Sequence, residues 1–320
     1  MKHPILATLL CAASFSLAAP AAAQEVFPSR PITIVVPFGP GSGTDLGARL
    51  LGQKLSEALG QPVVIDNKPG ANGSIAAELA AKARPDGYTL MMGTNSTHGA
   101  NPALMRELRY DPIKSFEPVT RVAVFTSIIV TRPSLPVKDM RELLAYGKDK
   151  ELTLTTGNAS GVVMSETLAR QVGWKLLRIP FKSNPQAMTE VIAGRVDMMF
   201  TDIAAAQGQL KAGALRPIAV TSLQRSALMP ELPSIAESGV PGYDLSGWIA
   251  LFAPAGTPRP IVDKLNAEVS KALKLPDVRA KFVELGADPS PMPAPEFTAW
   301  VQQEVSKWTR LVREAGIQPE

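Results

Sequence analysis

The stretch Ile32-Thr-Ile-Val-Val-Pro-Phe-Gly-Pro-Gly-Ser-Gly-Thr-Asp45 decides how the chain folds around it. Its first five residues are β-branched and predict a strand, and its glycine-rich middle predicts a tight loop. Leucines at helical spacing up to Leu59 predict a helix that begins near Thr44. Such a helix presents the unpaired N–H groups and the positive dipole end of its first turn to the loop. The segment therefore predicts a cradle for an anion.

The loop departs from two nucleotide-binding motifs. The dinucleotide fingerprint requires a third glycine where Thr44 stands, and the phosphate-binding P-loop requires a Gly-Lys pair that is missing here. Gly39, Gly41 and Gly43 still allow the backbone to approach a ligand closely. The cradle therefore suits a carboxylate better than a nucleotide.

The N-terminus has the pattern of a secretory signal peptide. A short basic start precedes an apolar run at 5–18, and alanines at 21–23 offer a cleavage site before Gln24. Cys11 lies inside the apolar run rather than at its end, so we expect a cleaved, soluble protein and no lipoprotein. Because Cys11 is the one cysteine of the chain, the exported protein is expected to contain no disulfide.

The length and charge of the chain limit its architecture and its partners. After cleavage about 297 residues remain, more than one hydrophobic core usually serves, which predicts two lobes. The full chain carries a net charge of only +4, and aromatic residues make up 6% of it. No run of lysine or arginine stands out, so we expect no nucleic-acid partner.

Strand-like and helix-like segments alternate, which predicts an α/β protein with largely parallel sheets and a ligand site beyond the strands' carboxyl ends. Strands are expected at 32–36, 63–65, 88–92, 119–130, 152–155, 196–200, 218–220 and 248–252. Helices are expected at 44–59, 74–83, 165–172, 186–193, 260–273 and 295–315. The long segments 119–130 and 245–252 are expected to cross between lobes. This gives a first lobe of 24–123 plus 248–320, a second of 124–247, and a cleft between them.

Five motifs in order resemble those of the Bug (TctC-like) periplasmic solute-binding receptors. They are PFGPGSGTD at 37–45, NKPGANG at 67–73, RPDGYTL at 84–90, NPAL at 101–104 and LFAPAGTP at 251–258. The resemblance covers essentially the whole mature chain. It implies a periplasmic, two-lobed Venus-flytrap fold of type II. It also implies delivery of a small organic carboxylate to the permease subunits of a tripartite tricarboxylate transporter in the inner membrane.

The resemblance implies no enzymatic step. With one histidine and no cysteine left after cleavage, we expect no histidine–cysteine metal site, and we expect no cofactor and a monomer. Two segments depart from the family pattern. The usual glycine-rich loop of the second lobe is TGNASG at 156–161, and the usual Lys-Gly pair is Lys182-Ser183. Both lie where ligand choice is expected, so they bear on the identity of the ligand and not on the class of protein.

The ligand is expected to contact loops of both lobes that carry neutral hydrogen-bonding groups. The candidates are Phe38, Gly39, Gly41, Ser42, Gly43, Thr44, Ser96, Thr97, His98, Thr156, Asn158, Ala159, Ser160, Ser183, Asn184 and Asp202. Ser42 and Asp45 also fit a helix cap, and we assign Asp45 to that role because its charge would repel an anion. His98 also fits a structural histidine, and Trp248 fits either a core residue of the hinge or an aromatic lid.

Two other functions compete with transport. A hydrolase would need Ser96 and His98 as a catalytic pair, although no Gly-x-Ser-x-Gly elbow surrounds Ser42, Ser96 or Ser160. A receptor that signals to a membrane sensor kinase would share the fold. If Phe38, Phe181 and Trp248 face the cleft, a flat aromatic dicarboxylate such as terephthalate is expected to bind better than citrate.

Overall fold

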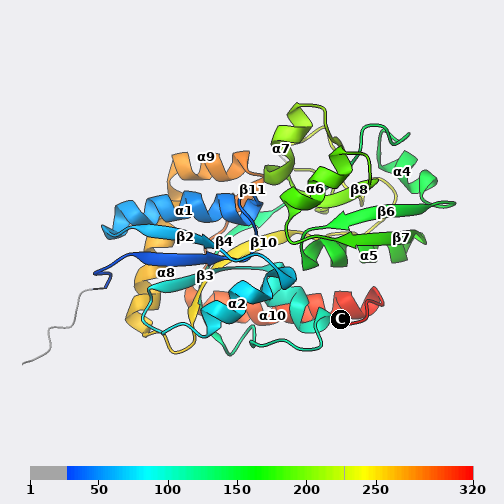
Figure 1. The fold of residues 1–320 in the computed structure, drawn as a ribbon. Helices are drawn as coiled ribbons and strands as arrows, with labels where there is room; N and C mark the ends of the chain where they lie inside the picture. Colours follow the sequence, from blue (N-terminus) through cyan, green and yellow to red (C-terminus); the bar gives the residue numbers. More distant parts are fainter. Residues whose placement is uncertain (1–26, 227, 320) are drawn as a thin grey trace, which may run out of the picture.

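The computed structural model describes residues 27–226 and 228–319. The expected signal peptide at 1–23 lies outside the described residues. The chain forms two β-sheets, each with helices on both faces, at opposite ends of an elongated molecule (Figure 1).

The first sheet has six strands in the order β11-β4-β10-β3-β1-β2. They are β1 (Ile32–Val36), β2 (Val63–Asn67), β3 (Thr89–Thr94), β4 (Phe116–Phe125), β10 (Gly247–Pro254) and β11 (Ala287–Pro289). The strands β1, β2 and β3 are parallel, whereas β10 pairs antiparallel with both β3 and β4. The expectation of largely parallel sheets is therefore wrong for this half of the sheet. The reason is that β4 leads out of the sheet and β10 leads back into it, so the two run in opposite directions.

The second sheet has five strands in the order β7-β6-β8-β5-β9. They are β5 (Ser127–Thr131), β6 (Glu151–Thr156), β7 (Lys175–Pro180), β8 (Met198–Asp202) and β9 (Arg216–Val220). β6 is parallel to β7 and β8, and β5 is antiparallel to β8 and β9. The single strand expected at 119–130 is two strands, β4 and β5. They are separated at Thr126, where the chain leaves one sheet and enters the other.

Helices cover both faces of each sheet. On the first sheet, α1 (Gly43–Leu59), α8 (Arg259–Lys274) and α9 (Pro276–Glu284) lie opposite α2 (Ser74–Ala81) and α10 (Ala294–Glu314). On the second, α4 (Met140–Tyr146) and α5 (Ala159–Val172) lie opposite α6 (Asn184–Ile192) and α7 (Ile203–Lys211). Successive strand residues face opposite layers: Leu90 and Met92 pack under α1, and Met91 packs toward α2. The short elements are η1 (Ala71–Gly73), η2 (Ser96–Ala100) and α3 (Asn101–Leu104).

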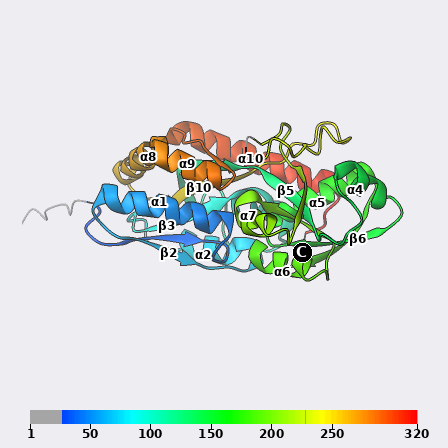
Figure 2. The same cartoon turned by 90° about the horizontal axis from the view of Figure 1, so that it is seen from above.

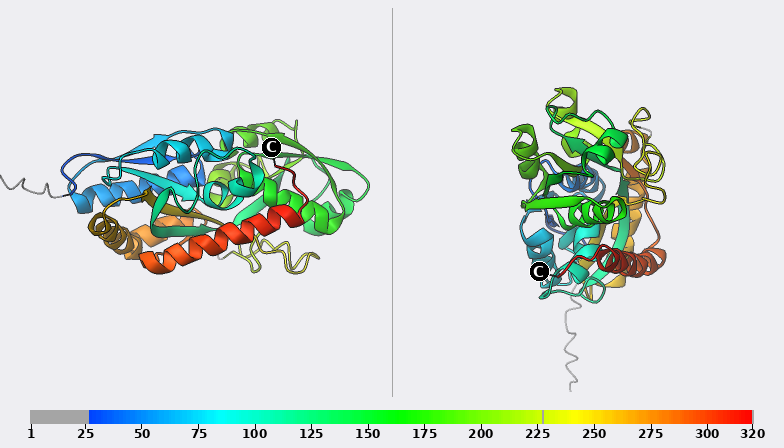
Figure 3. Two further views of the ribbon diagram at one scale, coloured as in Figure 1. Left: turned by 90° about the horizontal axis from the view of Figure 1, so that it is seen from below. Right: turned by 90° about the vertical axis from the view of Figure 1, so that its right-hand side faces the viewer.

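The last helix, α10, runs along the molecule from the first sheet to the second (Figure 3). Its residue Trp308 is fully buried and packs in the same apolar cluster as Leu168 of α5. Near its middle, Glu304 accepts hydrogen bonds from the indole N–H groups of Trp248, at 2.8 Å, and Trp308, at 2.9 Å. This helix therefore ties the strand that returns to the first sheet to the layer that covers the second.

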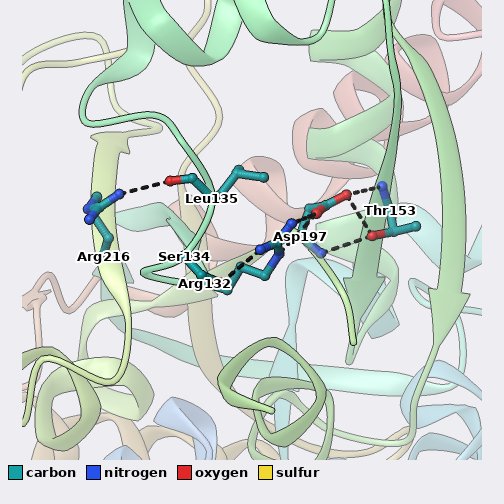
Figure 4. A network of polar contacts seen from close by, with 6 residues as sticks. All are labelled: Arg132, Ser134, Leu135, Thr153, Asp197 and Arg216. Carbon is teal, nitrogen blue, oxygen red and sulfur yellow. Dashed lines mark hydrogen bonds and ion pairs between the residues drawn. The ribbon is translucent and has the colours of Figure 1, made fainter. Parts of the chain in front are cut away.

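A polar network holds together the end of the second sheet that lies far from the first (Figure 4). Arg132, just after β5, forms an ion pair with Asp197, just before β8, at 3.0 Å. The Asp197 carboxylate also accepts from the backbone N–H and the hydroxyl of Thr153 on β6, at 3.0 and 2.8 Å. Three neighbouring strands, β5, β8 and β6, are thereby joined at this end of the sheet.

Across residues 27–226 and 228–319, none of the helices has the length and apolar character that crossing a bilayer requires.

Candidate ligand-binding site

Helix N-termini from both halves of the molecule point at one place between the sheets. Each is fixed by a side chain that accepts from a backbone N–H in the helix's first turn. Ser42 caps α1 at 3.2 Å, Asn158 caps α5 at 2.8 Å, and Asp202 caps α7 at 2.9 Å. The positive ends of three helix dipoles thus meet where the sheets face each other.

A cavity of about 60 Å³ lies at this meeting point. Its lining residues are Phe38, Gly43, Thr44, Thr94, Asn95, Ser96, Phe125, Ser127, Asn158, Ser160, Gly161, Met164, Phe200, Thr201, Asp202, Gly247, Trp248 and Ile249. They include hydroxyl, amide and backbone groups, and Asp202 is the one residue among them with a charged side chain. The described surroundings of the cavity therefore offer helix N-termini and neutral donors in place of lysine or arginine.

Direct side-chain contacts across the cavity hold the two halves together. The Oγ atoms of Ser96 and Ser160 lie 2.7 Å apart, and Asn95 Nδ2 donates to Ser160 Oγ at 2.6 Å. The backbone N–H of Ser160 also donates to Ser96 Oγ, at 3.1 Å. The remaining space is large enough for only a few water molecules. A ligand of several carbon atoms can therefore enter only if these contacts separate.

The first loop is held in shape by Asp45, which is 1% exposed. Its carboxylate accepts from Gly41 N–H at 2.9 Å, from Asn67 Nδ2 at 2.9 Å, and from Arg49. Burial would raise the pKa of Asp45, but the hydrogen bonds from Arg49, Gly41 and Asn67 outweigh burial, so its pKa is lowered. The structure confirms that Ser42 and Asp45 stabilise the loop and the helix start, as the cap interpretation predicts.

His98 lies in the core of the first lobe and not at the cavity. Residues 96–100 form a π-helical turn where the sequence predicts a loop, and the turn directs the imidazole inward. The ring stacks on Phe252 with centroids 3.9 Å apart and is fully buried. Burial lowers its pKa to about 3, which keeps the ring neutral at ordinary pH.

The pair that a hydrolase would need is not assembled. The Ser96 hydroxyl contacts Ser160, and His98 Nδ1 contacts the Thr97 hydroxyl at 2.9 Å. A histidine with a strongly lowered pKa is also a poor general base. The described geometry thus supports neither of the two roles that the hydrolase hypothesis assigns.

Asn158 and Asn184, two candidates of the second lobe, connect its loops through side-chain hydrogen bonds. Asn184 Nδ2 donates to Asp202 Oδ2 at 3.3 Å, and Asn158 Nδ2 donates to Asn184 Oδ1 at 3.4 Å. A Cβ on Gly157 would lie only 2.2 Å from the backbone nitrogen of Asn184, so these two loops touch. Ser183 faces the first lobe instead: its Oγ would lie 3.3 Å from a Cβ on Gly39.

The sequence candidates therefore fall into two groups. Those that line the cavity are Phe38, Gly43, Thr44, Ser96, Asn158, Ser160 and Asp202. Those placed elsewhere are Gly39, Gly41, Ser42, Thr97, His98, Thr156, Ala159, Ser183 and Asn184. The residues of the second group have side chains or backbone engaged in caps, loop packing or the core, and their expected contact with the ligand stays a prediction.

Several lining residues were not expected as contacts. Asn95, Ser127 and Gly247 lie where strands begin or end beside the crossing points, and Phe125 and Phe200 form apolar walls. Some of these residues lie in the segments 119–130 and 245–252, which the sequence analysis expects to cross between the lobes. Strands that join two lobes also line the space between them, so these segments could have indicated part of the lining. Trp248 is 3% exposed and its indole is bound to Glu304, which identifies it as a core residue of the hinge and not a lid.

Among the described residues, no group of three or more histidine, cysteine, aspartate or glutamate side chains is placed to hold a metal ion.

Two α/β lobes joined by crossing strands, with helix N-termini at the space between them, define a two-lobed solute-binding receptor of the periplasmic-binding-protein fold. Residues 47–317 match the sequence profile described as tripartite tricarboxylate transporter family receptor. The chain belongs to this family, as its motifs predict.

Solved structures of similar proteins agree with this assignment. The R. palustris protein Rpa4515, solved with adipate, is 35% identical with a TM-score of 0.90, over 92% of this chain and 100% of that chain. The periplasmic binding protein BugD is 32% identical with a TM-score of 0.88, over 92% and 100%. MatC from Rhodopseudomonas palustris, solved with bound malate, is 36% identical with a TM-score of 0.84, over 89% and 100%. These matches confirm the predicted fold class over nearly the whole described chain.

Proposed function

We propose that this protein is a periplasmic receptor that captures a small organic dicarboxylate and passes it to the permease subunits of a tripartite tricarboxylate transporter. The observation that carries the proposal is the meeting of helix N-termini from both lobes at a cavity whose neutral groups are donors. Such ends attract carboxylates through unpaired N–H groups and dipoles. The dicarboxylates bound to Rpa4515 and MatC support the same chemistry.

In this proposal each lobe holds one end of the ligand. Thr44 and the first N–H groups of α1 bind one carboxylate, and Asn158, Ser160 and the start of α5 bind the other. Two or three charge-assisted hydrogen bonds at each end, each worth roughly 1.5–3 kcal/mol before ordering costs, suffice for a micromolar complex of about −8 kcal/mol. Closure of the lobes then removes water from the ligand.

The organisation expected from the sequence completes the proposal. The signal peptide at 1–23 directs the chain to the periplasm. The mature protein acts there as a monomer; it binds no nucleic acid or metal and catalyses no reaction. The first lobe comprises 24–123 plus 248–320 and the second 124–247. The lobes move as units about the crossings beside Thr126 and Gly247, where strands of the two sheets meet.

The aromatic lining bears on the choice of ligand. Phe38, Phe125 and Phe200 give the cavity aromatic walls, whereas Trp248, which also borders it, has its indole bound to Glu304 in the core. Phe181 does not line it; this residue borders a separate groove beside Lys182. We therefore retain terephthalate as the proposed preferred class of ligand on the strength of the remaining aromatic walls.

A thermal-shift screen of the chain from Gln24 onward tests the function. Adipate, malate, terephthalate and citrate are compared with sugars and neutral amino acids, because a ligand that binds only the folded state raises the melting temperature. We expect a dicarboxylate to stabilise the protein. A response to sugars or neutral amino acids, with none to any carboxylate, would overturn the proposal. If adipate stabilises more than terephthalate, the aromatic preference is wrong.

Ser160→Ala tests the site, and Ser165→Ala is its matched control. Both serines lie buried on α5, but Ser165 Oγ donates to the Val162 carbonyl at 3.0 Å and does not line the cavity. We expect Ser160→Ala to weaken binding of the best carboxylate several-fold in calorimetry and Ser165→Ala to leave it unchanged. Equal affinities for both variants would remove the start of α5 from the site.

A further inference from the structure

One of the three helix ends at the cavity is already in contact with a carboxylate that the protein itself supplies. Asp202, the last residue of β8, belongs to the second sheet, and α1 belongs to the first. The start of α7 lies beside α1 (Figure 2). The Asp202 carboxylate lies against Gly43, in the first turn of α1. The contact therefore joins the two lobes at the anion cradle.

The fit between these groups is close. A Cβ on Gly43 would lie 2.5 Å from Asp202 Oδ1 and 2.8 Å from its Cγ. Asp202 is also fixed within its own lobe, since Oδ1 accepts from Ala205 N–H at 2.9 Å and Oδ2 accepts from Asn184 Nδ2 at 3.3 Å. The glycine at 43 lets the helix start approach this fixed carboxylate at a distance that any larger residue would prevent.

A ligand carboxylate and Asp202 cannot share this cradle without repulsion. Asp202 is the one charged side chain among the lining residues, so no cationic side chain of the lining offsets a second negative charge there. The donors in reach of both are the same few N–H groups at the start of α1. Whichever carboxylate occupies them excludes the other.

We propose that Asp202 is an internal competitor of the ligand: its carboxylate lies at the cradle of α1 and must leave it when a ligand carboxylate binds there. This inference rests on the proposed function, because it assumes that the ligand is a carboxylate. It assigns two effects to one side chain. Asp202 joins the two lobes at the cradle, and it lowers the affinity for the ligand, so that only acids with enough further contacts displace it.

The test uses Asp202→Asn, which removes the charge and keeps a side chain of the same shape and capping oxygen. Asp139→Asn is the matched control, because Asp139 also caps a helix of the second lobe, accepting from Glu142 N–H at 2.9 Å, and does not line the cavity. Affinities for adipate and malate are measured by calorimetry. The radius of gyration of the ligand-free proteins is measured by small-angle X-ray scattering. If Asp202→Asn folds poorly, Asp202→Ser replaces it, since serine also caps helices.

We expect Asp202→Asn to bind the better acid about tenfold more tightly and to be more open than the native protein without ligand, while Asp139→Asn changes neither quantity. Weaker binding by Asp202→Asn would overturn the inference and make Asp202 a direct ligand contact. An unchanged affinity and an unchanged radius of gyration would also overturn the inference, because Asp202 would then act only as a helix cap. If neither acid binds the native protein, the proposed function fails instead. The comparison of the radii of gyration still decides whether Asp202 joins the two lobes.

Discussion

Replacement of His98 by asparagine gives the most quantitative test of the structure. The imidazole is buried without exposure, and Nδ1 contacts the Thr97 hydroxyl, but Nε2 has no hydrogen-bond partner among the described residues. Asparagine places an amide near the position of Nδ1 and does not titrate. The substitution therefore removes the ionisable group and keeps a polar partner for Thr97.

The magnitude follows from proton linkage. Burial lowers the pKa of His98 from its ordinary value of 6.5 to about 3. The unfolded chain thus takes up a proton near pH 6.5 that the folded protein refuses until about pH 3. Stability from this group is complete above pH 6.5 and falls as the pH drops, by about 1.4 kcal/mol per pH unit. Between pH 7 and pH 4.5 the loss amounts to about 2.5 kcal/mol.

Urea unfolding of both proteins at pH 7.0, 6.0, 5.0 and 4.5 measures this effect. Loss of the Phe252 stacking and a small void give His98→Asn a constant cost that cancels when each protein is compared with itself across pH. We expect the native protein to lose about 2.5 kcal/mol more than the variant, and ligand affinity at pH 7 to differ by less than about twofold. Equal losses would refute the reasoning, because they would mean that the folded protein accommodates a protonated His98.

Three further substitutions test other parts of the structure. Asp45→Asn should cost about 1–3 kcal/mol at pH 7 in urea unfolding. That cost should shrink as the pH falls below 3.8, because the stability that the lowered pKa of Asp45 gives the folded protein is lost there. A cost that does not depend on pH would contradict this prediction. Glu304→Leu should cost about 2–5 kcal/mol because it leaves two buried indole N–H groups unpaired, and Glu304→Gln clearly less; equal costs would show that the acceptor oxygen is unimportant. Gly157→Ala should lower the melting temperature and the ligand affinity through its 2.2 Å clash, whereas Gly208→Ala, with nothing within 4 Å, should be neutral or stabilising; tolerance of alanine at both positions would mean that the loops are not in contact.

Local signals predicted the elements that carry the site. The strand–glycine loop–helix pattern located β1 and α1, and the observed helix begins one residue before the expected Thr44. The helix expected at 165–172 begins earlier, at Ala159, because the cap at Asn158 fixes its start. Propensity alone favoured the later apolar run, since Ser160 and Gly161 are poor helix formers. Capping chemistry therefore outweighed propensity at this helix.

The sequence analysis did not predict helices such as α4 and α7. These helices are short, or their apolar and polar residues are only weakly separated onto opposite faces. The sequence analysis also placed the His98 side chain at the ligand site, whereas it points into the core. Ser96, Thr97 and His98 are adjacent in sequence and all polar, so they received the same role. The π-helical turn separates them, because it directs Ser96 to the opposite lobe and His98 into the core.

The sequence by itself determined the family, the α/β class, the two-lobed organisation and the loops that carry helix N-termini, because each follows from residues close together in the chain. Only the tertiary structure decided which loops meet. Ser96 and Ser160 are 64 positions apart, and Asp202 meets Gly43 from another sheet. Such contacts depend on how the two lobes close on each other. No local pattern specifies that closure, because it is set by packing across the crossings and by the charges brought together there.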